Sequence, residues 1–535
     1  MRRFTSYGPA DPDLHYYAPR KELIEKAFTQ LLGEEPLKGG HYFTVWAPRQ
    51  TGKTWVMQQI LHRLKKDPRL HTLKINLEIL KRKTNVGEIL EIIAKEIGDG
   101  LGKTFEGIDD EFKFQGIFKK DVLDKPLILI LDEFDAIDEI GINTIVGVFR
   151  NIFIHRRDEI DNTTEQKTYL LHGVALIGVR SVLGIENQKG SPFNVQRSLH
   201  IPNLTHDEVK GLFQWYEKES RQTIDPEVID RLFYETNGQP GLTCWFGELL
   251  TETYNRDITT PITMKQFKYA YSNASNVLPN NNILNLISKV KKAPYRETAI
   301  ELFQTDEKIE FSFDNEELNY LYMNGVIDYE SVETDTGEME SYCKFSSPFV
   351  QTRLFNYFSR KLFDYLGQLI HPLDTMEDAV TTETLNIRHI MKRYQAYLDK
   401  NKDIFFKGVP RRKKDLKIYE AIYHFNLYRY LYDLLKKRGI EVIPEFPTGN
   451  GKIDLILKYR GRVYALELKS FSDIYDYRQG IEQAAAYGQK LGLPEIAYIV
   501  FVELKADEIK QLEQDIERPG IRVIVIPIAV LPGQS

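Results

Sequence analysis

The first third of the chain alternates short apolar runs with amphipathic stretches. Residues 41–64, HYFTVWAPRQTGKTWVMQQILHRL, begin as a β-rich run, pass through a loop with proline and glycine, and continue with the spacing of an amphipathic helix. Residues 126–138, PLILILDEFDAID, contain a five-residue apolar run that is typical of a strand buried in a parallel sheet. The apolar runs LKINL, before it, and GVALIGV and RSLHI, after it, follow the order that an α/β domain requires. We therefore expect an α/β fold here.

Helical spacing dominates the next segment. Residues 206–275 are helix-patterned, and HDEVKGLFQWYEKES and DPEVIDRLFYET each open on an acidic first turn, which the positive end of a helix dipole favours. Residues 282–356 change to short helices and then to two strand-like runs around residues 335–337, which predict a β-hairpin. We therefore expect a helical region over residues 206–275, followed by a smaller mixed region over residues 282–356.

The loop between the first strand and its helix carries phosphate-binding chemistry. It fits the P-loop pattern except that Ala47 replaces the first glycine, and alanine resists some backbone conformations that glycine adopts. Backbone N–H groups and the helix N-terminus would face the phosphates, Lys53 would reach the β- and γ-phosphates, and the Thr54 hydroxyl would ligate Mg²⁺. The candidate nucleotide-binding residues of this loop are Ala47, Pro48, Arg49, Gln50, Thr51, Gly52, Lys53 and Thr54.

Two consecutive acidic residues at the end of the buried strand form a Walker B pattern. Asp132 would hold the Mg²⁺, and Glu133 would polarise the attacking water as general base. The alternative, capping of the next helix, fits Asp135 better than it fits a consecutive pair at the end of a strand. Arg180 follows the fourth strand, where a γ-phosphate sensor would lie, and a surface arginine at the start of a loop is an equally good interpretation.

Four of these segments resemble one family. WAPRQTGKT, LILDEFD, SPFNV at 191–195 and ETNGQPGL at 235–242 are similar to the AAA-like ATPases of the prokaryotic STAND group, and the likeness runs to about residue 355. It implies a five-stranded ATPase core, a helical lid with a Gly-x-Pro element at Gly238 and Pro240, a winged helix, and a role as an ATP-controlled switch. Pro240 is thus a further candidate nucleotide contact. Taken alone, TNGQPGL is a helix end and a turn.

The same resemblance makes the hairpin around residues 335–337 the wing of a winged helix. Winged helices often bind DNA, but this wing has no Lys or Arg before Lys344, so phosphates would repel it. We expect a packing or signalling module instead. The acidic residues of the wing are Asp328, Glu330, Glu333, Asp335, Glu338 and Glu340.

A strictly alternating pattern occurs in the last third of the chain. Residues 452–470, KIDLILKYRGRVYALELKS, are two alternating runs joined at Arg460 and Gly461, and a two-residue turn with glycine second favours a type I′ hairpin. That turn fixes the register with Tyr459 opposite Arg462.

The predicted register gathers charge on one face of the hairpin. Asp454 is opposite Glu467, and Lys469 shares their face. Two carboxylates and an ammonium group suit phosphodiester cleavage, because carboxylates can ligate Mg²⁺ while a lysine steers or activates water. A surface strand with an ordinary cross-strand ion pair is the alternative. The other face is apolar and carries Ile453, Leu455, Leu457, Tyr464, Leu466 and Leu468.

This hairpin and its flanking helices resemble the PD-(D/E)XK nuclease superfamily over roughly residues 415–535. The resemblance implies that Asp454 and Glu467 are metal ligands, and that Gln483 and Tyr487 of the following helix support the site. Packing of that helix is an equally good interpretation of the latter two. Glu420, in the upstream helix, is the candidate first acidic residue, with a solvated helix glutamate as the alternative. The candidate catalytic residues are Glu133, Asp454, Glu467, Lys469, Gln483 and Glu420.

Composition narrows the class of protein. Of 535 residues, 42% are apolar and 28% are charged, a globular balance, and no run reaches the roughly 20 apolar residues of a membrane helix. The first residues lack the apolar core of a signal peptide and there are two cysteines, so we expect a reducing cytoplasm and no membrane partner. The formal net charge of −6 means that nucleic acid would have to bind a local patch. Residues 392–417, with ten Lys or Arg against three Asp, are the candidate, and a solvated linker fits them equally well.

These expectations define a multidomain α/β protein. ATP would control a Mg²⁺-dependent nuclease acting on nucleic acid, DNA ahead of RNA, with ATP and Mg²⁺ at the ATPase site, a separate Mg²⁺ site in the nuclease domain, and self-association on ATP binding. The alternatives are an ATP-dependent STAND-type switch or scaffold with an inactive nuclease-like domain, and a motor that feeds its own nuclease. The expected domains are an AAA-like P-loop ATPase core (1–205), a helical lid (206–280), a winged helix (281–358), a helical and basic linker (359–414), and a PD-(D/E)XK, restriction-endonuclease-like domain (415–535).

Overall fold

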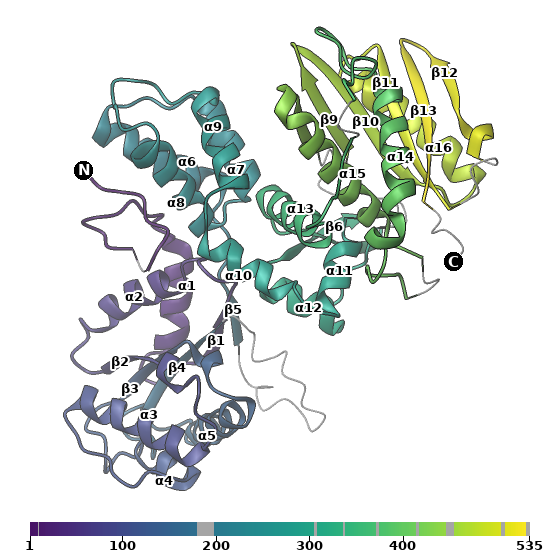
Figure 1. Ribbon diagram of the computed structural model, residues 1–535. Helices are drawn as coiled ribbons and strands as arrows, with labels where there is room; N and C mark the ends of the chain where they lie inside the picture. Colours follow the sequence, from purple (N-terminus) through teal and green to yellow (C-terminus); the bar gives the residue numbers. More distant parts are fainter. Residues whose placement is uncertain are drawn as a thin grey trace. The chain divides into compact units, whose positions relative to one another are not determined.

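The chain forms two compact units (Figure 1). The first comprises Met1–Ala274 and Asn319–Gly325, and the second comprises Ser275–Leu318 and Val326–Ser535. Within the part of the chain that the structure describes, none of the helices combines the length and hydropathy of a membrane-spanning segment. The computed structural model describes residues 1–8, 10–178, 197–303, 308–334, 337–370, 374–413, 417–445, 454–503 and 509–530.

A parallel sheet forms the centre of the first unit. Its described strands lie in the order β2-β3-β4-β1-β5. Strand β3 is buried along its whole length, as a strand covered on both faces must be. The strands coincide with the apolar runs of the sequence, so the predicted α/β core is confirmed. They are β1 (Tyr42–Trp46), β2 (His71–Asn76), β3 (Leu127–Asp132), β4 (Leu171–Gly178) and β5 (Arg197–His200).

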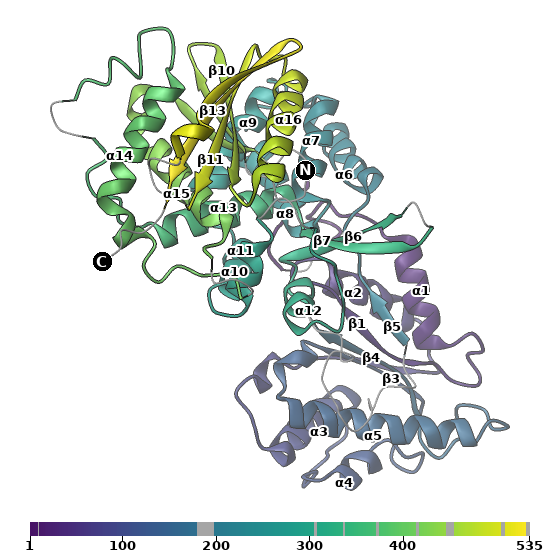
Figure 2. The same cartoon turned by 90° about the vertical axis from the view of Figure 1, so that its right-hand side faces the viewer.

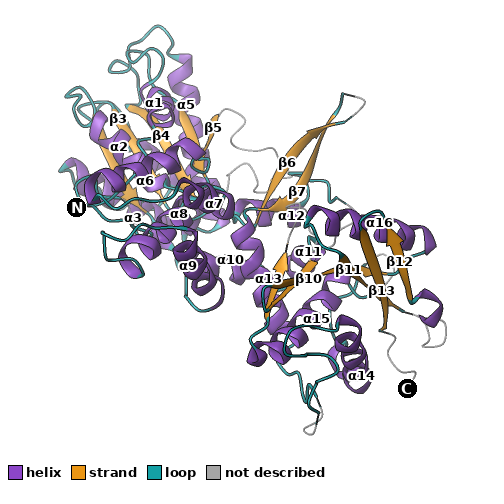
Figure 3. Cartoon of the chain, turned by 90° about the horizontal axis from the view of Figure 1, so that it is seen from above, coloured by secondary structure: helices purple, strands orange, loops and turns teal. Residues whose placement is uncertain are grey.

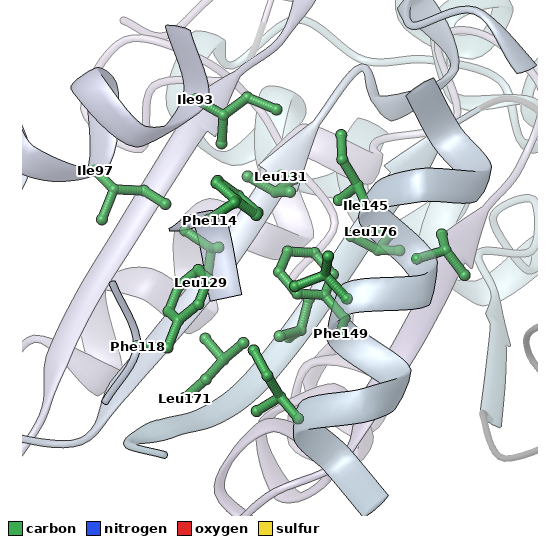
Figure 4. Packing of buried hydrophobic residues seen from close by; sticks show 14 of the residues in the cluster. Ile93, Ile97, Phe114, Phe118, Leu129, Leu131, Ile145, Phe149, Leu171 and Leu176 are labelled. Atoms are coloured by element: carbon green, nitrogen blue, oxygen red, sulfur yellow. The ribbon is translucent and has the colours of Figure 1, made fainter. Parts of the chain in front are cut away.

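Helices cover both faces of this sheet (Figure 1). One face packs against α1 (Lys21–Leu32) and α2 (Lys53–Leu64) through Ile128 and Ile130 of β3. The alternate residues of β3 point to the opposite face, where Figure 4 shows Leu129 and Leu131 among buried phenylalanines. The helices there are α3 (Val86–Leu101), α4 (Glu111–Gly116) and α5 (Glu139–Asp158), and the short helices η1 (Glu78–Leu80) and η2 (Phe134–Ala136) follow β2 and β3.

The predicted lid is helical. Helix α6 begins with a capping box, in which the Thr205 hydroxyl accepts from the Glu208 N–H while the Glu208 carboxylate accepts from the Thr205 N–H. Helix α7 ends where Asn237 and Gly238 both adopt left-handed conformations. The helices are α6 (His206–Ser220), α7 (Pro226–Thr236), α8 (Pro240–Glu248), the π-turn η4 (Leu249–Thr253) and α9 (Met264–Asn276).

Gly238 occupies a position that only glycine fits. Its φ is +65°, and a Cβ there would lie 2.0 Å from the carbonyl oxygen of Leu204. We expect Gly238→Ala to destabilise the N-terminal unit by about 2 kcal/mol or more, because the left-handed conformation and the clash both oppose a side chain. Thermal melting followed by circular dichroism should show a lower midpoint. The matched control is Gly211→Ala on α6, where a Cβ meets open space. Equal melting midpoints of the Gly238→Ala and wild-type proteins would contradict the claim that only glycine fits at this position.

A mixed segment precedes the second sheet. Strands β6 and β7 form an antiparallel hairpin from Ile327 opposite Phe345 to Glu333 opposite Met339, as the sequence predicts. Asp335 and Thr336, at the predicted turn, lie outside the described residues. Identification of this segment as a winged helix stays a prediction. Its elements are α10 (Asn281–Lys289), α11 (Tyr295–Glu301), α12 (Glu316–Met323), β6 (Ile327–Glu333), β7 (Met339–Phe345) and α13 (Pro348–Leu362).

The second unit contains a mixed sheet, of which Figure 3 labels β10, β11, β12 and β13. The described strands of this sheet lie in the order β12-β13-β11-β10-β9-β8. Strands β8, β9 and β10 are an antiparallel meander, and α16 then crosses to β11, which pairs parallel with β10. The strands are β8 (Glu441–Glu445), β9 (Asp454–Tyr459), β10 (Arg462–Ser470), β11 (Glu495–Val502), β12 (Gln514–Arg518) and β13 (Ile521–Ala529).

Helices also cover both faces of the second sheet. Figure 2 shows α16 on one side and α14 and α15 on the other. Close approach of α16 depends on Gly480, because a Cβ there would lie 2.0 Å from the hydroxyl of Tyr498 on β11. The helices are α14 (Ile387–Phe405), α15 (Glu420–Leu435) with η5 (Lys436–Arg438), α16 (Ile474–Lys490) and η6 (Lys510–Leu512).

Helix α14 lies within the predicted linker and packs on the sheet. The Gln395 side chain bonds Ala529 of β13 twice, with Nε2 donating to its carbonyl at 3.1 Å and Oε1 accepting from its N–H at 2.7 Å. Tyr394 is fully buried and donates to Asn426 of α15 at 2.9 Å. This part of the predicted linker is therefore folded onto the domain that follows it.

Candidate functional site

The loop between β1 and α2 takes the predicted shape without its first glycine. Positive φ values fall at Gln50 (60°) and Gly52 (89°), and not at Ala47. Ala47 is fully buried and packs in the core with residues of β1 and α2. The methyl group therefore fills space and imposes no strain, because the left-handed conformations that favour glycine occur elsewhere in the loop.

Lys53 begins α2 and folds back over the loop. Its Nζ donates to the carbonyl oxygens of Ala47 and Pro48, both at 2.8 Å. Burial lowers the pKa of Lys53 to about 8, against the opposing effect of nearby carboxylates, with Glu133 the largest. Lys53 is mostly protonated at pH 7, so a half-buried cation faces the loop where phosphates are expected.

Asp132 ends β3 and is almost fully buried. Its Oδ2 lies 3.5 Å from the Thr54 hydroxyl and 2.7 Å from Nζ of Lys74 on β2. Hydroxyl and carboxylate oxygens are ligands that Mg²⁺ prefers, so Thr54 and Asp132 fit the predicted metal site. Lys74 was missed by the sequence analysis, although a single lysine inside the apolar run LKINL was its signal.

Glu133 has a left-handed φ of 55°. Burial raises its pKa and the charges of Asp135 and Asp132 raise it further, against the opposing effect of Lys53 and Arg49. A carboxylate whose proton affinity is raised is a better general base, as its predicted role requires.

Asp135 does not cap the following helix, so that interpretation of the sequence is wrong. The N-cap of α5 is Asp138, whose carboxylate accepts from the Gly141 N–H at 2.9 Å. Asp135 instead lies beside the end of β4, where a Cβ on Gly178 would be 3.0 Å from its Oδ1. The sequence did not reveal this, because η2 separates the strand from the helix.

The Gly-x-Pro element lies against the loop. Pro240 is the first residue of α8, and the residue before it, Gln239, donates from Nε2 to the carbonyls of Arg49 and Gln50 at 3.1 and 3.2 Å. Gln239 was not among the predicted site residues. Arg180 and the segment 191–195 lie outside the described residues.

The hairpin in the second sheet has the predicted turn and register. Arg460 and Gly461 have φ values of 49° and 75°, as a type I′ turn requires. The paired residues run from Tyr459 opposite Arg462 to Leu455 opposite Leu466, and the next position of this register is Asp454 opposite Glu467. The side chain of Asp454 lies outside the described part of the chain.

Glu467 and Lys469 are both buried, with 2% and 6% of their surface exposed. Ala465, two residues before Glu467 and on the same face, packs with residues of α16, so α16 covers the charged face. The alternative of a surface strand is therefore wrong, whereas an ordinary cross-strand ion pair is not tested, because the side chain of Asp454 lies outside the described part of the chain. Burial of charge is costly, and such clusters occur preferentially at functional sites.

Glu420 joins α15 to the end of β10. It is the first residue of the helix, and its Oε2 accepts from the Ser470 N–H at 3.1 Å. The solvated-glutamate interpretation is wrong, since 14% of this side chain is exposed. His424, one turn later and missed by the sequence analysis, is fully buried with Nε2 3.5 Å from Glu420 Oε1. Burial, with a smaller effect of the Lys469 charge, lowers the pKa of His424 to about 3.

The two candidate residues of α16 differ in environment. Gln483 is exposed, whereas Tyr487 is half-buried and packs on the apolar cluster under the helix. Packing accounts for Tyr487, and a role for Gln483 stays a prediction. Among the described residues, which do not include the side chain of Asp454, no group of three or more His, Cys, Asp and Glu is arranged to hold a metal ion.

Part of the basic stretch is neutralised by acidic neighbours. Arg393 pairs with Asp374 and Asp378, and Lys413 lies 3.4 Å from Glu317. Arg411, Lys413 and Lys407 are exposed, while Lys414 lies outside the described residues. The local positive excess is therefore smaller than the sequence count indicates.

The strand order, the loop and the Walker B pair together define a P-loop ATPase domain. Residues 7–260 match the family model described as AAA-like domain, so this part of the chain is an AAA-like ATPase domain. None of the curated proteins compared with the chain matches it.

Solved structures with a similar fold cover about two thirds of the chain. The Walker-type ATPase PABY2304 of Pyrococcus abyssi is 14% identical, with a TM-score of 0.43, over 66% of this chain and 99% of that chain. The ORC2 protein of Aeropyrum pernix in ADPNP–ADP complexes is 13% identical, with a TM-score of 0.39, over 66% and 96%. The Aeropyrum pernix ORC1 protein in complex with DNA is 15% identical, with a TM-score of 0.32, over 65% and 95%. These values are too low to carry an argument about ligands or partners.

Proposed function

We propose that this protein is an ATP-controlled, Mg²⁺-dependent nuclease, in which the AAA-like domain binds and hydrolyses ATP and residues 415–535 cleave nucleic acid, DNA ahead of RNA. The observation that carries the proposal is the burial of Glu467 and Lys469 on one strand. The observed hairpin register ends at Leu455 opposite Leu466, and its continuation by one position would put Asp454 opposite Glu467. A folding role alone would favour apolar residues at these positions, because buried ions are costly to desolvate.

In the ATPase site, the chain's own groups account for binding and hydrolysis. The N–H groups of the loop and the Lys53 ammonium would bind the phosphates, and Thr54 and Asp132 would hold Mg²⁺. Lys74 fixes the orientation of the Asp132 carboxylate through their 2.7 Å ion pair. Glu133 accepts the proton of the attacking water.

In the nuclease site, Asp454 and Glu467 would hold a second Mg²⁺. A bound Mg²⁺ lowers the pKa of a water molecule and neutralises charge that develops on the phosphate. Lys469 would orient the attacking water, and Glu420 fixes the end of β10 by accepting from the Ser470 N–H. The exposed residues Arg411 and Lys413 are candidates to guide the nucleic-acid strand.

The test compares cleavage with and without ATP. End-labelled and circular DNA and RNA are incubated in Mg²⁺ or Mn²⁺ with wild type, Lys53→Ala and the control Lys66→Ala, whose lysine is exposed after α2. Wild type and Lys66→Ala should cleave at rates that ATP changes, and Lys53→Ala should have lost the ATP effect, because it lacks the phosphate-binding cation.

Two outcomes would contradict the proposal. Cleavage that is equal with and without ATP would separate the nuclease from the ATPase. If nothing is cut under any condition while ATP changes the mass of the particle, the protein is instead an ATP-dependent switch or scaffold with an inactive nuclease-like domain. Light scattering on the same samples measures that mass.

A further inference from the structure

The carbonyl oxygens of the nucleotide loop are occupied by two sets of donors. Those of Ala47 and Pro48 accept from Lys53 Nζ, at 2.8 Å each. Those of Arg49 and Gln50 accept from Gln239 Nε2 of the lid, at 3.1 and 3.2 Å, and Gln50 also accepts from the Gly241 N–H at 3.0 Å. The lid therefore holds the second half of the loop.

These bonds determine which way the peptide units of the loop face. In a trans peptide the C=O and N–H groups point in opposite directions. With the carbonyls of Arg49 and Gln50 turned to the lid, the N–H groups of Gln50 and Thr51 are turned away from it. Successive N–H groups presented together in this way are the donors that bind phosphate in such loops.

Local structure places the Gln239 side chain between helix and loop. As N-cap of α8 it accepts from the Leu242 N–H through Oε1 at 2.5 Å, which leaves Nε2 for the loop. Gly241 allows the close approach, because a Cβ there would lie 2.5 Å from Gln50 Oε1. The amide group of Gln239 thus contacts both elements: its Oε1 caps α8, and its Nε2 donates to the loop.

We propose that Gln239 is a positioning residue that holds the loop N–H groups for the phosphates of ATP and transmits nucleotide binding to the lid. It acts through the loop and need not touch ATP itself. Because the same bonds join loop and lid, a ligand that stabilises this loop conformation also stabilises the first turn of α8, and the reverse holds. The inference rests on ATP binding by the AAA-like domain and is independent of nuclease activity.

The test separates the two ends of the amide. Gln239→Glu keeps the Oε1 acceptor that caps α8 and replaces the Nε2 donor with an oxygen that the loop carbonyls repel. Gln239→Asn also caps helices well but is one methylene shorter, so it loses its reach. Gln266→Glu is the matched control, since the bonds of Gln266 to Thr263 use Oε1 only.

Two measurements are made on the full chain. Isothermal titration gives the Kd for ATP and ADP, and hydrogen exchange with and without ATP reports the amides of Gly241 and Leu242. We expect both Gln239 variants to bind ATP at least about tenfold more weakly, a loss of about 1.4 kcal/mol, and to lose the ATP-dependent protection of these amides. Gln266→Glu should behave as wild type.

Affinities within twofold of wild type in both variants, or lid protection that still responds to ATP, would overturn the inference. If Gln239→Glu fails to fold, Gln239→Asn decides alone. A wild-type protein that does not bind ATP would overturn both this inference and the proposed function. Wild-type ATP binding that both variants retain would overturn this inference alone, so the two failures are distinguishable.

Discussion

The Glu133→Gln variant is expected to hydrolyse ATP about a hundred- to a thousandfold more slowly than wild type, which is the usual contribution of a general base. Glutamine has the same size but cannot accept the proton of the attacking water. ATP affinity should be equal or higher, because the change removes one negative charge near the phosphates. Phosphate release measures hydrolysis, and titration with ATP measures binding.

The control for Glu133→Gln is Glu139→Gln, an exposed carboxylate in the first turn of α5. It makes the same chemical change outside the site and should leave turnover unaltered. Equal turnover in Glu133→Gln and wild type would show that another group accepts the proton, and Asp135 would be the next residue to test, since its charge acts on both Glu133 and Lys53.

The Glu467→Gln variant is expected to lose nucleic-acid cleavage by about a thousandfold, as removal of a group that stabilises transition-state charge does. Glutamine fills the same buried volume, so the fold should persist. A second readout is independent of activity: if Glu467 holds Mg²⁺, then Mg²⁺ or Mn²⁺ should raise the thermal midpoint of wild type more than that of Glu467→Gln.

The matched control is Glu441→Gln, an exposed carboxylate at the start of β8 in the same sheet. It should retain both cleavage and the metal-dependent midpoint. Undiminished cleavage by Glu467→Gln would contradict the proposed nuclease site. If the metal ion raises the thermal midpoint of Glu467→Gln as much as that of wild type, Glu467 is not a metal ligand.

Much of the local structure could be predicted because it depends on neighbouring residues. The apolar run before Asp132 predicts a buried strand from its length and composition. The turn at Arg460 and Gly461 predicts the hairpin register, because side-chain direction alternates strictly along a strand and the turn type fixes which residues are opposite. Both predictions are confirmed.

Other features could not be read from the pattern. Ala47 in place of the first glycine suggested a restricted backbone at that position, yet the positive φ values of the loop fall at Gln50 and Gly52. Helix capping, the alternative interpretation that fitted Asp135 best, is provided by Asp138. In both cases the pattern identifies the residues of a loop but not the conformation of each peptide, which depends on what the loop packs against.

The sequence by itself determined the order of strands and helices along the chain, the nucleotide loop and the register of the hairpin that turns at Arg460 and Gly461. Only the tertiary structure decided that α16 buries Glu467 and Lys469, that Lys74 pairs with Asp132, and that Gln239 contacts a loop 190 residues away in the chain. The physical reason is that periodicity records which face of an element is apolar. The partner that covers a face, or bonds a loop, depends on long-range packing that local pattern does not encode.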